Sequence, residues 1–156
     1  MGQWTVRPPQ AGLMSGRQSM VETEFRSPFM QEAAARGFIF QCTDPQGLDA
    51  LMVQGPVGAY IGFDPTADSL HVGSLIQIML LRLLQRHGHR PFALMGGGTA
   101  RIGDPSFREE ARRLMTEDII QTNLAGIESC LRQFLTFGDA PSDAQLVNNA
   151  DWLDKL

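Results

Sequence analysis

The chain has 156 residues, a mass of 17.2 kDa and a formal net charge of −4 at pH 7, which is the size of one ordinary domain with a core of its own. The negative charge argues against a domain that mainly coats nucleic acid, and no apolar run approaches the roughly 18 residues of a membrane span. We therefore expect a soluble globular protein. Because Lys155 is the only lysine, we expect any phosphate to be bound through Arg, His or backbone N–H groups.

Cysteine and histidine are sparse and badly spaced for metal binding. The two cysteines are Cys42 and Cys130, and the three histidines are His71, His87 and His89. This pattern favours neither a disulfide framework nor a zinc site, so we expect no protein-bound metal. A reducing, cytoplasmic setting fits the cysteine usage best.

Residues 1–22 contain the paired prolines Pro8 and Pro9 and scattered Gly and Ser, without helical or strand periodicity. We expect a flexible N-terminal arm there, and one folded unit over residues 23–156.

Two short helices are expected next. Ser27 followed by Pro28 is typical of an N-cap and a first helical residue, and the helix should end near Gly37. Thr43 fits the start of a capping box ahead of a second helix. The expected buried stripe of that second helix is Leu48, Leu51 and Met52.

A strand, a helix and a second strand follow. Residues 57–63 are a short apolar run, which predicts a buried strand, and residues 91–95 predict the next one. The segment 71–87 has helical periodicity, and Gly88 supplies the stop. Such a unit is expected to have parallel strands joined by a right-handed crossover. The expected apolar face of the helix is Leu75, Ile76, Met79, Leu80, Leu83 and Leu84.

The C-terminal part continues this alternation. Thr116 begins an amphipathic helix that should run to about residue 135, and residues 145–149 predict a third strand. Residues 151–153 begin a further element. Three strands with alternating helices indicate an α/β protein with the first half of a doubly wound parallel sheet.

Open α/β sheets bind ligands outside the carboxyl ends of their strands, here the loops 63–71 and 95–106. The first loop leads into His71, Gly73 and Ser74 at the start of a helix. Backbone N–H groups at a helix start attract an anion, His71 adds a directed donor, and Gly73 would let a base or ribose approach the backbone. The alternative is that His71 is only an N-cap and Gly73 only a packing glycine.

Two longer strings carry a family resemblance. Residues 60–74 read YIGFDPTADSLHVGS, and residues 88–106 contain GHRP, GGGT and GDPS in that order. Both resemble the tyrosyl-tRNA synthetases, which are class I aminoacyl-tRNA synthetases, and the likeness covers roughly residues 30–156. The resemblance implies part of a Rossmann-like fold of the HIGH-type nucleotidyl transferases, with parallel strands and flanking helices.

The resemblance also implies a reaction and its participants. The carboxylate of L-tyrosine attacks the α-phosphate of ATP, pyrophosphate leaves, and the tyrosyl group then passes to tRNA(Tyr). Mg²⁺ is expected on the ATP phosphates. The complete enzyme is expected to be a cytoplasmic homodimer without membrane contact.

Site residues follow from the resemblance by position. Tyr60 would bind the phenolic hydroxyl of the substrate, and Asp104 would bind its ammonium group. Alternatives remain, since Tyr60 could be an ordinary strand aromatic and Asp104 a turn residue. The other residues expected around the tyrosine are Asp64, Leu94 and Thr99.

The ATP side is implied in the same way. His71 and Ser74 are the expected catalytic residues beside the phosphates, although Ser74 stands where the family pattern has a second histidine. The residues expected to contact ATP are Gly62, Thr66, His71, Gly73, Arg108 and Arg112.

The family pattern extends beyond Leu156 and includes RNA-reading domains, so we expect this chain to be an N-terminal fragment of the catalytic domain. Phe107 and Arg108 also replace a common Gly-Lys pair. One alternative is a non-catalytic remnant that dimerises or binds a partner. A further one is a nucleotidyltransferase of similar topology that acts on another nucleotide.

Overall fold

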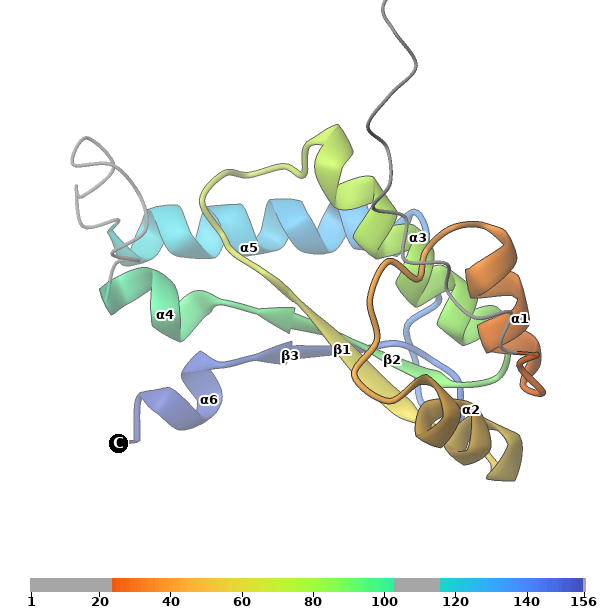
Figure 1. Cartoon of the computed structure of the whole chain (residues 1–156). Coiled ribbons are helices and arrows are strands. Elements are labelled where there is room, and N and C mark those ends of the chain that lie inside the picture. The colour runs from red at the N-terminus through yellow and green to blue at the C-terminus, as the bar shows by residue number, and fades with distance from the viewer. Residues whose placement is uncertain (1–23, 103–115, 156) are drawn as a thin grey trace, which may run out of the picture.

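The computed structural model describes residues 24–102 and 116–155, and the expected arm over 1–22 lies outside them. Figure 1 shows the elements in chain order. They are α1 (Pro28–Ala35), α2 (Pro45–Gln54), β1 (Gly58–Phe63), α3 (Val72–Arg86), β2 (Arg90–Met95), α4 (Gly97–Ile102), α5 (Glu117–Arg132), β3 (Gln145–Asn148) and α6 (Ala150–Leu153). Within the described ranges, none of these helices has the length and apolar character that crossing a membrane requires.

The three strands form one parallel sheet in the order β1-β2-β3. Phe63 pairs with Met95, and Met95 pairs with Asn148, so the carboxyl ends of all three strands meet at one edge. Helix α3 connects β1 to β2 across one face. The predicted partial doubly wound, Rossmann-like sheet with flanking helices is confirmed.

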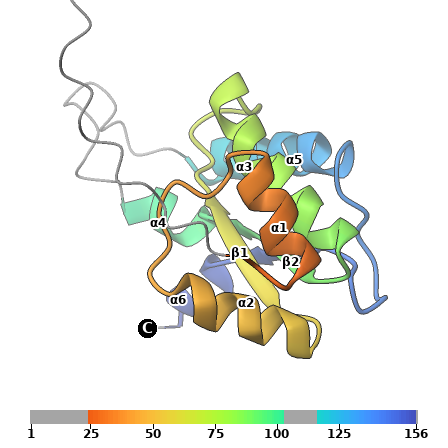
Figure 2. The ribbon, with the colours of Figure 1, turned by 45° about the vertical axis from the view of Figure 1, so that its right-hand side comes forward.

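One face of the sheet is covered, and the other is open along β1. Phe63, Ala93 and Met95 are buried in a core with residues of α3 and α5, and Figures 1 and 2 show these two helices on the same side of the sheet. On β1 the alternate positions Gly58, Tyr60 and Gly62 are exposed, and Tyr60 is 70% exposed. The expectation of a buried β1 is therefore wrong for one of its faces, because no described element packs there.

A second core joins α1, α2 and the end of α3. Ser27 caps α1 as predicted, since its hydroxyl accepts a hydrogen bond from the N–H of Met30 at 3.2 Å. The cap of α2 is Asp44, which accepts from the N–H of Gly47 at 2.8 Å, so the prediction of Thr43 is wrong by one residue. Leu51, which was expected to be buried, is 50% exposed.

Helix α3 buries only part of the face expected, since Leu83 and Leu84 are buried as predicted but the first turn is not. Leu75 and Ile76 are exposed, whereas Ile78 and Leu81 are buried. In Figure 1 the first turn of α3 lies away from the sheet, and its apolar residue Val72 is exposed as well. Gly88 follows the helix with a φ of 80° and ends it as predicted.

The later elements differ from prediction mainly at their ends. The segment 95–106 was expected to be a loop, but its first part forms α4. Thr116 is the N-cap of α5 without a side-chain hydrogen bond, and α5 ends at Arg132 rather than near 135.

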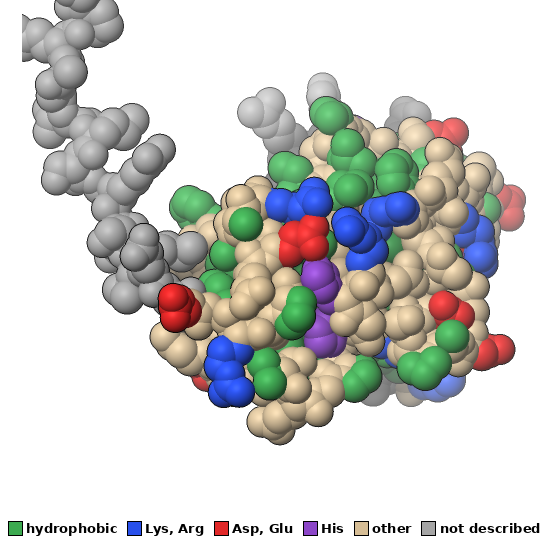
Figure 3. All heavy atoms as spheres, turned by 90° about the vertical axis from the view of Figure 1, so that its right-hand side faces the viewer, with side chains coloured by type: hydrophobic (Ala, Val, Ile, Leu, Met, Phe, Trp, Pro, Cys, Tyr) green, Lys and Arg blue, Asp and Glu red, His purple; other side chains and the backbone are tan. Residues whose placement is uncertain are grey.

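Two histidines between α3 and β2 hold neighbouring segments together. His87 Nε2 lies 2.7 Å from Glu32 Oε2, so α3 is joined to α1. Figure 3 shows on this face histidine side chains beside an acidic one, with basic side chains next to them. His89 is buried, and its Nδ1 accepts a hydrogen bond from the N–H of Val57 at 3.1 Å, just ahead of β1.

Candidate active site at the carboxyl edge of the sheet

The carboxyl ends of the strands are joined by backbone hydrogen bonds. The N–H of Gly96 donates to the carbonyl of Phe63 at 3.0 Å, and the N–H of Asn149 donates to the carbonyl of Met95 at 2.9 Å. The loops that were predicted to bind ligands therefore begin at strand ends whose relative positions are set by these hydrogen bonds.

Asp64 and Thr99 converge over Gly96. A Cβ on this glycine would lie 2.9 Å from Asp64 Oδ1 and 3.0 Å from Thr99 Oγ1. Any larger residue would displace one of these two side chains, since heavy atoms do not approach a Cβ so closely. Two residues expected at the tyrosine site are thus brought together, Asp64 from just after β1 and Thr99 from α4.

Asn149 supports this arrangement and was not identified from the sequence as a site residue. Its side chain is buried, Oδ1 accepts from the N–H of Gly98 at 2.7 Å, and Nδ2 donates to Thr99 Oγ1 at 3.2 Å. Thr99 in turn donates to the carbonyl of Gly96 at 3.0 Å. The pair Asn148 and Asn149 was visible in the sequence, but only the fold shows that the second amide anchors the start of α4.

Tyr60 and Leu94 occupy the open face of the sheet. Tyr60 is paired with Phe92 and Gly62 with Leu94, and a Cβ on Gly62 would meet nothing within 4 Å. The lone phenol therefore stands on the same face as a half-buried leucine, with free space above the glycine between them. This surface leaves room for a flat group beside Tyr60.

The start of α3 presents His71 in a defined orientation. His71 is its N-cap, and Nδ1 accepts from the N–H of Gly73 at 2.9 Å. A Cβ on Gly73 would lie 2.6 Å from the ring, so the ring rests on this glycine. Because Nδ1 is the acceptor, the neutral ring carries its proton on Nε2, which is then free to donate. His71 is thus the N-cap of α3, as the alternative interpretation stated, and its Nε2–H is still available to donate to a ligand. Ser74, one turn on, is half-buried.

Arg101 is committed to structural ion pairs. Its guanidinium contacts Glu117 at 2.8 and 2.9 Å and also binds Asp154, so it joins α4, α5 and α6. The hydrogen bonds from Arg101 lower the pKa of the Glu117 carboxyl. The candidates Asp104, Arg108 and Arg112 lie outside the described residues.

In the described ranges, no group of three or more His, Cys, Asp or Glu side chains is arranged to hold a metal ion.

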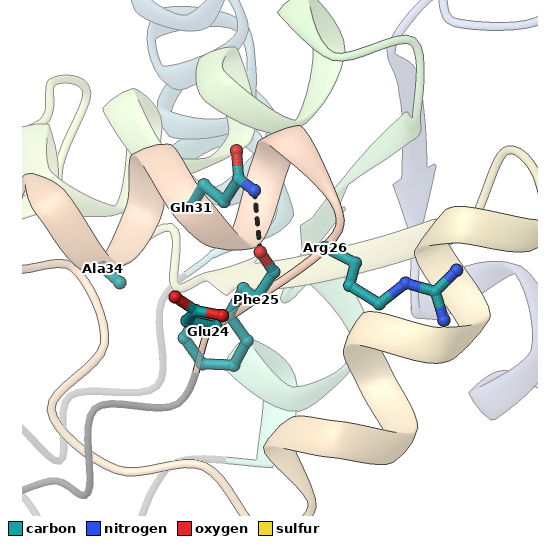
Figure 4. Close-up of a pocket in the computed structure, with 5 residues that line it drawn as sticks. All are labelled: Glu24, Phe25, Arg26, Gln31 and Ala34. Carbon is teal, nitrogen blue, oxygen red and sulfur yellow. Dashed lines mark hydrogen bonds between the residues drawn. The ribbon is translucent and has the colours of Figure 1, made fainter.

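A cavity of about 630 Å³ lies beside α1, where Gln31 Nε2 donates to the carbonyl of Phe25 at 2.7 Å (Figure 4). It contains none of the candidate residues, and the strand ends therefore remain the candidate site. Its lining residues are Glu24, Phe25, Arg26, Gln31 and Ala34.

Comparison with known proteins shows which family the chain resembles. Residues 52–156 match the sequence model of the tRNA synthetases class I (W and Y). The tyrosine–tRNA ligase of Gluconobacter oxydans is 68% identical over 133 residues, which cover 84% of this chain and 32% of that protein. The tyrosine–tRNA ligase of Rhodospirillum rubrum is 66% identical over 131 residues, covering 84% and 31%.

Solved structures show the same relationship. A C-terminally truncated mitochondrial tyrosyl-tRNA synthetase of Coccidioides posadasii superposes with a TM-score of 0.67 at 32% identity, covering 81% of this chain and 36% of that one. The chain spans about a third of the length of these ligases. Since the family model matches more than half of its residues, the chain belongs to the tRNA synthetases class I (W and Y), and the relatives described above are of the tyrosyl type.

Proposed function

We propose that this chain supplies the tyrosine- and ATP-binding part of a tyrosine–tRNA ligase. The observation that carries the proposal is the convergence of Asp64 and Thr99 over Gly96, at the strand ends beside the open face with Tyr60 and Leu94. The identity of 68% to a named tyrosine–tRNA ligase supports the same substrate.

The tyrosine side of the site follows from its chemistry. The aromatic ring of the substrate would lie on Gly62 and Leu94, and its phenol would exchange a hydrogen bond with Tyr60. Asp64 and Thr99 would bind the polar end, and Asp104 would pair with the ammonium group. A pocket that hydrogen-bonds a hydroxyl rejects the analogue lacking it, because the polar group of the pocket is then left unpaired.

The ATP side would lie at the start of α3. An oxygen of the tyrosine carboxylate forms a bond to the α-phosphorus while the bond from that phosphorus to the bridging oxygen breaks, and pyrophosphate leaves with the electron pair. Nε2–H of His71 and the hydroxyl of Ser74 would donate to the phosphate oxygens as charge builds up. Gly73 and Thr66 would line the nucleotide, and Arg108 and Arg112 would contact its phosphates.

The remaining partners are part of the proposal. Mg²⁺ would arrive on the ATP phosphates, because this ion keeps several waters and binds phosphates readily. The tyrosyl group would pass to tRNA(Tyr), and the longer protein would act as a homodimer. The two cysteines, Cys42 and Cys130, are free thiols, which fits a cytoplasmic location.

A second candidate is a non-catalytic fragment that binds a partner. The observation in its favour is the open sheet face, where the phenol of Tyr60 meets solvent rather than a second wall of a pocket. A site with one wall holds substrate weakly, since little of the ligand is removed from water.

Tyrosine-dependent exchange of labelled pyrophosphate into ATP separates the two candidates. We would compare the 156-residue chain with a hybrid in which the remaining two thirds of the Gluconobacter ligase follow residue 156. The proposal predicts exchange by the hybrid that requires tyrosine and is abolished by His71→Ala. Exchange that is independent of tyrosine, or greater with another amino acid, would refute it. A hybrid without exchange would favour the non-catalytic fragment.

A further inference from the structure

The loop between β1 and α3 is attached to a helix that follows much later in the chain. Asn123 of α5 is only 7% exposed, and its Nδ2 donates to the carbonyl of Pro65 at 2.8 Å. Pro65 is itself buried. The backbone of the loop is therefore pinned at a point one residue before Thr66.

A second attachment lies one helical turn further along α5. A Cβ on Gly126 would overlap the carbonyl oxygen of Asp68 and would lie 2.7 Å from its carbonyl carbon. The loop backbone thus rests directly on the helix. A glycine inside a helix costs about 0.5–1 kcal/mol relative to alanine, and this close approach explains why one stands here.

The two attachments act on the same short segment. Asn123 and Gly126 are three residues apart on one face of α5, and they hold Pro65 and Asp68, which are also three residues apart. The side chains between these points are exposed and offer little packing of their own. The position of the loop therefore depends on α5.

We propose that Asn123 and Gly126 are positioning residues for the ATP side of the site. Neither is a candidate to touch a substrate. They hold the loop so that Thr66, inside the pinned segment, and His71, three residues beyond it, keep their places relative to the strand ends. The inference rests on the proposed function for its ATP readout, but the loop placement is measurable without activity.

The first measurement uses the 156-residue chain and the ¹H–¹⁵N NMR spectrum of its amides. Gly126→Ala and the nearly isosteric Asn123→Asp, which lacks the donor, should shift the amide resonances of residues 64–71. Thr122→Ala is the matched control, because it also raises helix propensity in α5 but lies on the exposed side. Spectra in which residues 64–71 move no more than in the control would overturn the proposal.

The second measurement is pyrophosphate exchange by the hybrid chain. Gly126→Ala and Asn123→Asp should lower kcat/KM for ATP by about tenfold or more, as expected for misplaced reacting groups, while KM for tyrosine stays within about twofold. Equal losses for tyrosine and ATP, or no loss in either variant, would overturn the proposal. If the unaltered hybrid shows no exchange while the resonances shift, the proposed function fails and α5 still positions the loop.

Circular dichroism melting separates positioning from folding. If Gly126→Ala acted only through the helix propensity of α5, the variant would be more stable and would use ATP as the unaltered chain does. The same result is expected for Thr122→Ala. The proposal predicts instead that ATP use by Gly126→Ala falls at an assay temperature at which its melting curve shows the variant to be folded. Should Gly126→Ala fail to fold, Asn123→Asp carries both measurements alone.

Discussion

Replacing Asn149 by alanine should destabilise the carboxyl edge of the sheet by about 2–4 kcal/mol. The variant leaves the buried N–H of Gly98 without an acceptor, which costs about 1–3 kcal/mol, and removes a hydrogen bond to Thr99 that contributes about 0.5–1.5 kcal/mol. For a chain of this length each kcal/mol lowers the melting temperature by about 2–4 °C, so a fall of roughly 5–15 °C is expected.

The assay is urea unfolding of the 156-residue chain, followed by circular dichroism at constant pH. Asn149→Asp is the matched variant, because a carboxylate still accepts from Gly98 but has no amide hydrogen for Thr99. We expect it to lose at least about 1 kcal/mol less than Asn149→Ala. A loss below about 0.5 kcal/mol for Asn149→Ala, or equal losses for the two variants, would refute the reasoning from these hydrogen bonds.

Three more predictions follow from residues already described. In the hybrid chain, Tyr60→Phe should weaken discrimination between tyrosine and phenylalanine in pyrophosphate exchange by about 1–3 kcal/mol, and an unchanged ratio would remove Tyr60 from that role. Burial, with a smaller effect from the His87 charge, lowers the pKa of His89 below 6.5. The neutral form of His89 therefore contributes to the free energy of unfolding above pH 6.5, and this contribution is lost as the pH falls through the pKa of the folded state. Urea unfolding from pH 8 to 5 should show this loss, and it should be smaller in His89→Asn, which keeps an acceptor for Val57 but does not titrate. Burial raises the pKa of Asp49, but the N–H donors of Arg26 and Ser27 outweigh it and lower the pKa below 3.8, so this contribution is present above pH 3.8 and lost as pH falls further. Asp49→Asn should therefore cost about 1.5–3 kcal/mol at pH 7 and much less near pH 2; the same cost at both values would contradict a charged acceptor.

Local signals predicted much of the fold. Ser27 and Gly88 mark helix ends through capping and a left-handed φ, both of which depend on only a few neighbouring residues. Thr43 and Asp44 are both good N-caps, and the sequence does not distinguish them. The structure selects Asp44, which stands directly before the proline at the first helical position.

Features that depend on distant contacts were harder to predict. The apolar side chains of α3 point in several directions, and packing against the strands decides that Ile78 is buried while Ile76 is not. The glycine-rich segment after β2 looked like a loop, but its N–H at Gly98 is paired by Asn149 from beyond β3, and a helix begins there.

The candidate site divides in the same way. Family strings pointed to Tyr60, Asp64 and Thr99, and the fold brings Asp64 and Thr99 together over Gly96. Asn123 carries no local motif, because its role depends on a carbonyl 58 residues earlier in the chain. Such a contact becomes visible only when both segments are in place.

The most direct measurement is a crystal structure of the hybrid chain with a non-hydrolysable tyrosyl-adenylate analogue. We predict that the ligand's ring lies on Gly62 and Leu94, with its phenol oxygen in hydrogen-bond reach of Tyr60 and its phosphate mimic beside Nε2 of His71. An analogue bound with its ring away from this sheet face, or with no contact to the start of α3, would contradict the account.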